Sequence, residues 1–214
     1  MKFRDFEKKY GQYPFISTNF LKYEEEKFIY LTRLISEWKT KNWIIQLKKG
    51  IYVINKEIYT KNLSSYFIAN NIYIPSYISL QSALSFYNLI PEGVFTVTSI
   101  SSKKKQQFTN KMGNFSYHHL KKSLFFGFTL LDYQGQKIFF ARAEKAFLDF
   151  VYLHFTNAQN YENFYHSYRL QNLQILKIAV LEEYLAKFKN KNLEKTVKNI
   201  LKYAQKLQAE FNYI

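Results

Sequence analysis

The sequence predicts an α+β protein, and three observations support that prediction. In several segments apolar residues recur at three- and four-residue steps, which is the period of a helix. Other segments are short β-branched or alternating runs bounded by turn residues, as in strands. The chain also has material for a substantial core, since 47% of its 214 residues are apolar, including 19 Tyr and 21 Phe.

The first 58 residues are expected to form an N-terminal unit of three helices and a hairpin. The predicted elements are helices over residues 1–10, 17–23 and 27–41 and strands over residues 43–47 and 51–54. Ser17 or Thr18 can cap the second helix, and Gly50 suits the positive φ that a tight hairpin often needs. The order helix, helix, helix, hairpin predicts a winged helix-turn-helix for residues 1–58.

The third predicted helix is amphipathic. Its apolar face consists of Phe28, Leu31, Leu34, Ile35 and Trp38. At about 100° per residue, the opposite face carries Ile29, Tyr30, Arg33, Ser36, Glu37 and Thr40. Such a helix can enter a major groove while the hairpin tip touches flanking phosphates, although an amphipathic helix beside a hairpin is also common in other α+β domains.

Arg33 is the candidate for a base contact, because arginine can bond a guanine edge bidentately, and Tyr30 and Ser36 could assist it. An ion pair between Arg33 and Glu37, one turn later, is the alternative. The candidate phosphate contacts are Lys27, Lys48, Lys49, Ser17, Thr18 and Asn19. The last three could instead only cap a helix, and lysines at a turn are often simply solvated.

A mixed α/β domain is expected over residues 59–160, and the segment 55–62 is expected to be a linker that leads to its first helix. Its predicted elements are a helix at 63–70, a helix capped by Ser76 or Ser79 that ends before Pro91, strands at 94–100, 115–120, 125–131 and 137–140, and a helix from residue 143. Lys103–Lys105 form a basic tip. Residues 161–214 are expected to form a helical C-terminal extension, packed on this domain through an apolar stripe from Leu193 to Phe211.

The formal net charge of +15 favours a polyanionic partner, of which nucleic acid is the usual one. The excess is spread along the chain and is nearly all lysine. A chain this rich in Lys, Asn, Ile, Tyr and Phe could also reflect an AT-rich coding sequence. Charge therefore supports double-stranded DNA as a partner without establishing it.

The sequence indicates a soluble, cytoplasmic protein without a membrane partner. No run approaches the roughly 18 uncharged apolar residues of a membrane span, and the N-terminus is too charged for a secretory signal. There is no cysteine, so disulfides and thiol chemistry are excluded.

No enzymatic chemistry, cofactor or metal is expected. None of the four histidines has the spacing of a metal-binding pair on a helix, and no phosphate-binding or nucleophile motif is present. Asp132 and Glu144 could form a nuclease-like acidic pair, but the accompanying lysine spacing is missing. For Glu144 and Asp149, capping or pairing with Arg142 or Lys145 is the expected role.

Five motifs in order resemble one known family. They are Leu47–Val53 with its basic-Gly-hydrophobic-Tyr pattern, Tyr77–Leu84 followed by Leu89–Pro91, Val94–Thr98, Phe125–Gly127 and Ala141–Asp149. Over roughly residues 12–155 the chain is similar to the AbiEi family, the antitoxin and transcriptional-regulator components of type IV toxin–antitoxin, or abortive infection, systems.

This resemblance implies two roles. The protein would repress its own promoter by binding inverted repeats through its N-terminal winged helix, and its second domain would be an antitoxin domain. The antitoxin would counteract a cognate nucleotidyltransferase-type toxin without needing a stable complex. The alternative is a protein-interaction module of a phage-defence or mobile-element locus that does not bind DNA.

Overall fold

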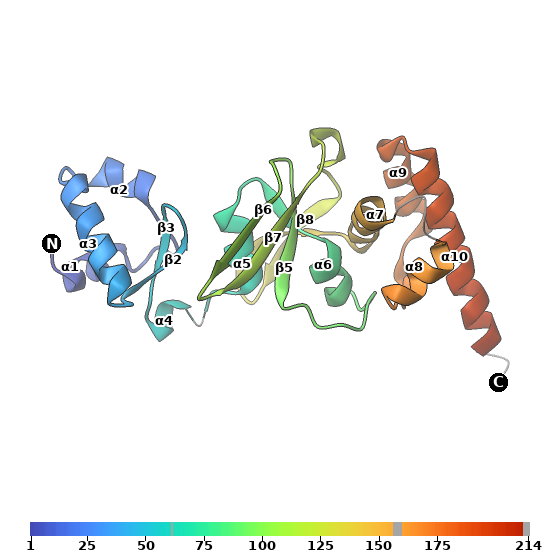
Figure 1. Cartoon of the computed structure of the whole chain (residues 1–214), viewed down its shortest axis with the longest axis horizontal. Helices are drawn as coiled ribbons and strands as arrows, with labels where there is room; N and C mark the ends of the chain where they lie inside the picture. Colours follow the sequence, from blue (N-terminus) through green and yellow to red (C-terminus); the bar gives the residue numbers. More distant parts are fainter. Residues whose placement is uncertain (61, 156–159, 212–214) are drawn as a thin grey trace.

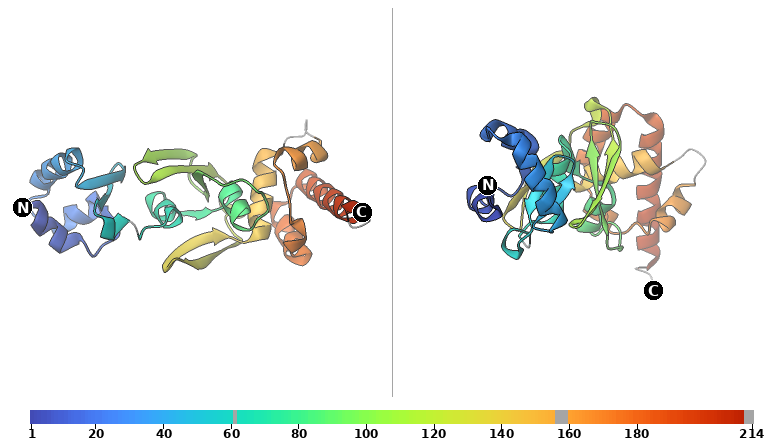
Figure 2. Two further views of the ribbon diagram at one scale, coloured as in Figure 1. Left: turned by 90° about the horizontal axis from the view of Figure 1, so that it is seen from below. Right: turned by 60° about the vertical axis from the view of Figure 1, so that its left-hand side comes forward.

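The computed structural model describes residues 1–60, 62–155 and 160–211. Three parts follow one another along the long axis: a small N-terminal unit, a six-stranded sheet with its helices, and a group of helices at the far end (Figure 1). The view from below shows the same row, with the two termini at opposite ends (Figure 2). Mixed helices and strands confirm the predicted α+β class.

Part of the predicted organisation lies outside the described residues. Residue 61 is next to the expected boundary between the first two units, residues 156–159 close the expected second domain, and residues 212–214 end the expected extension.

The N-terminal unit contains every element that the sequence predicted for it. The observed elements are α1 (Phe3–Tyr10), β1 (Ile16–Ser17), α2 (Thr18–Glu24), α3 (Phe28–Thr40), β2 (Ile44–Lys48) and β3 (Ile51–Ile54). The strands form an antiparallel sheet in the order β1-β3-β2. The sequence did not predict β1, because two residues are too short to show an alternating pattern.

The predicted faces of α3 are confirmed. Leu31, Ile35 and Trp38 are buried, and the side chains expected on the opposite face are exposed. The Trp38 ring packs against Phe3 and Phe6 of α1, with ring centroids 5.3 Å and 4.8 Å away. This aromatic layer holds α3 in a single orientation on the unit, with its polar side toward solvent.

Gly50 forms the hairpin turn with a φ of +81°, as the turn chemistry predicted. A Cβ at this position would lie 2.8 Å from Oγ1 of Thr18, so the close approach also requires glycine. The backbone N–H of Thr18 donates to the Gly50 carbonyl at 2.9 Å. The turn is thereby tied to the start of α2.

The second part of the chain is built on a mixed sheet with the strand order β6-β7-β5-β4-β9-β8. Its elements are α4 (Glu57–Thr60), α5 (Ser65–Ile72), β4 (Ser76–Ile78), α6 (Leu80–Phe86), β5 (Thr96–Ser101), β6 (Gln106–Asn110), β7 (Gly113–His119), η1 (Lys122–Leu124), β8 (Phe128–Tyr133), β9 (Gln136–Ala141) and α7 (Ala143–His154). The pairs β5–β7 and β4–β9 are parallel, and the other pairs are antiparallel.

Three local predictions are corrected here. The expected linker at 55–62 contains the short helix α4. Of the two candidate caps, Ser79 is the N-cap residue of α6, whereas Ser76 begins the buried central strand β4, whose three residues are too short for a periodic signal. The edge strand β6 was also missed, because its exposed positions are mostly polar and only Phe108 carries an apolar signal.

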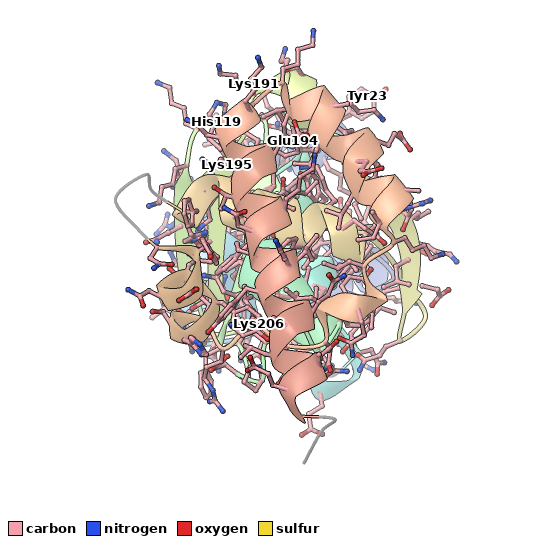
Figure 3. The ribbon with its side chains drawn as sticks, turned by 90° about the vertical axis from the view of Figure 1, so that its right-hand side faces the viewer. Tyr23, His119, Lys191, Glu194, Lys195 and Lys206 are labelled. Atoms are coloured by element: carbon pink, nitrogen blue, oxygen red, sulfur yellow. The ribbon has the colours of Figure 1, made fainter. Side chains whose placement is uncertain are left out.

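The C-terminal helices cover the far end of this sheet domain. They are α8 (Tyr161–Ser167), η2 (Leu173–Ile175), α9 (Ile178–Phe188) and α10 (Lys191–Phe211). On α10, Leu193, Val197, Ile200 and Ala204 are buried in the same core as the residues of α7. The side chain of Phe211, the expected end of this stripe, lies outside the described part. Figure 3 shows Lys191, Lys195 and Lys206 along the outer side of α10.

A buried ion pair joins β4 to α7. Lys145 and Asp149, one turn apart on α7, bond to each other with both side chains fully buried. Asp149 also accepts hydrogen bonds of 2.9 Å from the hydroxyls of Tyr77 and Ser79, while Lys145 donates to Tyr77 at 3.0 Å. The sequence predicted pairing of Asp149 with Lys145 or Arg142, and in the structure the partner of Asp149 is Lys145.

Burial dominates the acid–base behaviour of this pair. It raises the pKa of Asp149 and lowers the pKa of Lys145, while the opposite charge of each partner counteracts the shift of the other. The Lys145 ammonium also lies over the rings of Phe126 and Phe188, at 5.0 Å and 5.2 Å from their centroids. The pair therefore links the sheet, α7 and α9.

The N-terminal unit docks on the sheet domain through its hairpin. Ile45, Leu47 and Val53 belong to the core of the sheet domain and not to the separate core around α3. The side-chain amide of Asn110 donates to the Leu47 carbonyl at 2.9 Å. One side of the hairpin is thus covered by the sheet domain and the other packs on the core around α3 through Ile44 and Ile54, so the exposed position of the hairpin is Lys49 at its turn.

Within the described residues, no helix is both long and apolar enough to cross a membrane.

Breaking the buried pair is expected to destabilise the protein strongly. Asp149→Asn leaves the Lys145 charge buried without its counter-charge, which costs about 3–5 kcal/mol. The measurement is the urea midpoint followed by circular dichroism. The matched control is Asp132→Asn, which breaks the exposed pair with Lys137 and should leave the midpoint almost unchanged. Equal losses in the two variants would contradict the role of the buried pair.

A second variant covers the case in which Asp149→Asn does not fold. In Lys145→Met/Asp149→Leu, two apolar side chains of similar size replace both charges, so much of the lost stability should return.

The N-terminal unit is expected to lose stability in acid through Glu25. Hydrogen bonds from Tyr10 and Lys9 hold the pKa of Glu25 below its usual value. Because this pKa is lower in the folded than in the unfolded state, the contribution is present above the unfolded pKa, about 4.3, and is lost as the pH falls through the lower folded value.

The measurement is the urea midpoint from tryptophan fluorescence, since Trp38 and Trp43 both lie in this unit. At pH 7 the urea midpoint of the wild type should be higher than that of Glu25→Gln. The difference between the two midpoints should disappear below about pH 4. A difference that is independent of pH would show that Glu25 acts through packing alone.

Candidate functional site

The exposed side of α3 presents Tyr30, Arg33 and Ser36 at successive three-residue steps, which places them along one side of the helix. The buried residues on the other face of α3 pack on the core of the N-terminal unit and hold the helix in place. Tyr30 and Arg33 therefore extend from a rigid support into solvent, while Ser36 turns back and donates its hydroxyl hydrogen to the Thr32 carbonyl at 3.2 Å.

Arg33 does not form the ion pair that was its alternative role. Glu37 pairs with Lys41 instead. Among the described residues, Arg33 has no hydrogen bond or ion pair, so its five N–H donors are available to a partner.

The three polar residues at the start of α2 differ in what they do. Ser17 is the N-cap, and its Oγ accepts from the backbone N–H of Phe20 at 3.1 Å. Thr18 packs against the hairpin turn, as described above. Asn19 is exposed on the first turn of α2, and of the three it is the side chain free to face a partner.

Lys27 is exposed at the N-terminus of α3, in acidic surroundings. Together with Tyr30, Glu24 and Glu26 it lines an open hollow of about 510 Å³. Glu25 also lines the hollow, and its carboxylate accepts hydrogen bonds from Lys9 and Tyr10. The acidic side chains of this hollow repel phosphate, so Lys27 is less favourably placed than the lysine of the turn.

The two lysines of the hairpin have different environments. Lys49 is exposed at the turn. Lys48 is half-buried against the sheet domain, with its ammonium 5.9 Å from the ring centroids of both Tyr73 and Phe108. Burial and the neighbouring Lys103 lower the pKa of Lys48.

A basic cluster spans the junction between the two units, and the sequence did not reveal it. Lys103 lies over the same Tyr73 ring as Lys48, at 5.7 Å from the centroid. The Tyr73 hydroxyl donates to the Lys104 carbonyl at 2.9 Å, which holds the β5–β6 connection beside the hairpin. Lys103–Lys105 were recognised as a basic tip, but their proximity to Lys48 depends on how the hairpin docks.

The two carboxylates considered for a nuclease site have separate partners. Asp132 is exposed on β8 and pairs with Lys137 at 2.9 Å. Glu144 is buried on α7 and accepts from the backbone N–H of Lys177 at 3.0 Å. Over the described ranges, no group of three His, Asp or Glu residues could hold a metal ion.

Two histidines that are distant in sequence come together. His118 on β7 and His154 at the end of α7 have ring centroids 6.1 Å apart. Burial lowers the pKa of both, and the proximity of His154 adds to the shift of His118. Both rings therefore favour the neutral form, and each has a partner: Ser116 for His118 and the Phe150 carbonyl for His154.

Comparisons of the chain with known protein families and with curated proteins find no match.

Proposed function

We propose that this protein is a DNA-binding transcriptional repressor whose N-terminal unit acts as a winged helix-turn-helix. The supporting observation is the exposed side of α3, where Arg33 is unpaired on a helix held rigidly from behind. The order α1-β1-α2-α3-β2-β3 agrees with such a unit, with β2 and β3 as the wing. In this arrangement α3 enters the major groove and the wing turn approaches the backbone.

The proposed contacts divide into base and phosphate contacts. Arg33 is the base-reading side chain, with Tyr30 beside it. Lys49 at the wing turn and the exposed lysines of the β5–β6 connection, Lys104 and Lys105, form a basic surface for phosphates. Lys48 supports this surface from its half-buried position. The net charge of +15 agrees with a polyanionic partner.

The antitoxin role rests on the sequence resemblance to the AbiEi family. In that role the protein counteracts a nucleotidyltransferase-type toxin, and its repressor activity acts on inverted repeats in its own promoter. The role requires a nucleotidyltransferase gene beside the gene for this chain. Co-expression of the chain should relieve the growth arrest that this gene causes, and an unrelieved arrest would exclude the antitoxin role.

A second candidate function is a protein-interaction module without DNA binding. Two exposed apolar side chains beside the α3 surface favour it: Tyr23 is 89% and Ile29 is 87% exposed. Exposed apolar side chains mark a docking surface where they form a continuous patch, so this function requires Tyr23 and Ile29 to contact one partner together. Salt-sensitive binding to the upstream intergenic DNA distinguishes the two functions, because a protein-docking surface does not require it.

Arg33→Ala is expected to relax operator preference at one base position, at a cost of about 1–3 kcal/mol. The measurement is fluorescence anisotropy with the protein's own promoter and with a scrambled duplex of equal length. Arg4→Ala, on the exposed side of α1, is the matched control, because it removes the same charge from the same unit. Identical binding of both duplexes by wild type and Arg33→Ala would count against base reading by α3.

Lys49→Ala is expected to weaken operator and scrambled duplex equally, because a phosphate contact carries no sequence information. The slope of log K against log salt should fall by about 1. Lys202→Ala, on the exposed side of α10, serves as the control with equal net charge. An unchanged slope in Lys49→Ala would exclude the wing turn from the interface.

A further inference from the structure

The six-stranded sheet has two edges, and they differ in what covers them. The edge strand β6 faces the hairpin of the N-terminal unit, to which Asn110 donates a hydrogen bond. The edge strand β8 pairs with β9 on one side, and within the described residues no strand pairs with its other side. The left view of Figure 2 shows the β8–β9 hairpin, in yellow, on the outside of the molecule. The edge of β8 is therefore open to a partner strand.

The backbone groups of Leu130 point out of this edge. Leu130 lies opposite Phe139 of β9, and the N–H of Phe139 donates to the side chain of Asn70 instead of to β8. In an antiparallel pair, hydrogen-bonded and non-hydrogen-bonded residue pairs alternate along the strands. Leu130 and Phe139 are therefore a non-hydrogen-bonded pair, and the N–H and C=O of Leu130 are directed away from β9.

A second hydrogen bond gives the same alternation. The N–H of Arg142 donates to the Gly127 carbonyl at 3.0 Å, three residues along the ladder from Leu130 and Phe139, where a bonded pair is expected. Phe128 and Asp132, two residues to either side of Leu130, therefore share its orientation. The outer edge of β8 thus presents the N–H and C=O groups of Phe128, Leu130 and Asp132.

One face of the hairpin is apolar beside this edge. Leu130 is 57% and Phe139 is 47% exposed, and the two side chains lie opposite each other on the same face. Inward from them is a cavity of about 290 Å³, bounded by α5, the segment before β4, and the β8–β9 hairpin. Its lining includes Phe128, Phe139, Asn70 and Ser76. The open edge is therefore flanked by exposed apolar surface, and β8 has no lysine or proline that would keep another strand away.

We propose that β8 is the interface of a homodimer, in which the β8 strands of two copies pair antiparallel about a two-fold axis at Leu130. Such an edge is complementary to a second copy of itself, because each outward N–H then meets an outward C=O. The two Leu130 side chains meet at the axis, between the two Phe139 rings. The exposed apolar side chains of both copies thereby form one continuous stripe.

The charges of the hairpin agree with a second copy as the partner. The only charged residue of β8 is Asp132, which in this register lies opposite Phe128 of the other copy, so no two like charges face each other. Within each copy Lys137 pairs with Asp132 at 2.9 Å. This edge therefore lets two copies of a chain with a net charge of +15 approach without bringing unpaired lysines together. The inference does not depend on DNA binding, and its test uses no DNA.

The experiment is sedimentation equilibrium of the full chain over a range of micromolar concentrations. Wild type should sediment as a dimer that dissociates on dilution. Leu130→Lys places two like charges at the axis and should weaken dimerisation at least about tenfold. The matched control is Ile178→Lys on α9, which adds the same charge at a side chain that is 50% exposed and should sediment as wild type. A wild type that stays monomeric up to its solubility limit, or equal dimerisation of the two variants, overturns the proposal.

Amide hydrogen exchange of the wild type locates the pairing. In the dimer the outward N–H of Leu130 is bonded to the other copy, so its exchange should slow at least about tenfold between dilute and concentrated protein. The N–H of Leu131 is directed to β9 in both states and serves as the internal control. If the chain dimerises while exchange at Leu130 is independent of concentration, the interface lies elsewhere and the assignment to β8 is overturned.

Discussion

The structure of the sheet domain depends on the buried ion pair of Lys145 and Asp149. Two charges away from water are tolerated only when they bond to each other and to further polar groups. Here Tyr77 and Ser79 of the central strand region supply those groups, and aromatic rings from both sides enclose the ammonium. Because Tyr77 of β4 bonds to both members of the pair on α7, these contacts join α7 to β4.

The sheet domain that contains this pair also forms the cavity wall and the surface on which the hairpin of the N-terminal unit docks. Tyr77 connects the pair to the aromatic wall of the cavity, since Phe128 stacks on its ring. At the other edge of the sheet, β6 and Tyr73 receive the hairpin of the N-terminal unit. A docked hairpin has little freedom to reorient, so less conformational entropy is lost when the proposed reading helix and the lysines of the sheet domain engage one duplex together.

The proposed functions use chemically distinct parts of the molecule. The proposed DNA surface combines Arg33 of α3 with the exposed lysines of the wing turn and the β5–β6 connection, which supply its positive charge. The cavity bounded by α5, β8 and β9 is lined in part by aromatic side chains, and the proposed dimer edge beside it exposes Leu130.

The sequence by itself determined the local structure of this protein. Periodicity and turn chemistry predicted the two faces of α3 and the Gly50 turn, because each depends on neighbours within a few residues. The tertiary structure decided the burial of Lys145 and Asp149, the half-burial of Lys48, the strands β4 and β6 and the cavity at Asn70. These depend on contacts between segments up to 72 residues apart, as between Tyr77 and Asp149, and such contacts leave no periodic signal in one sequence.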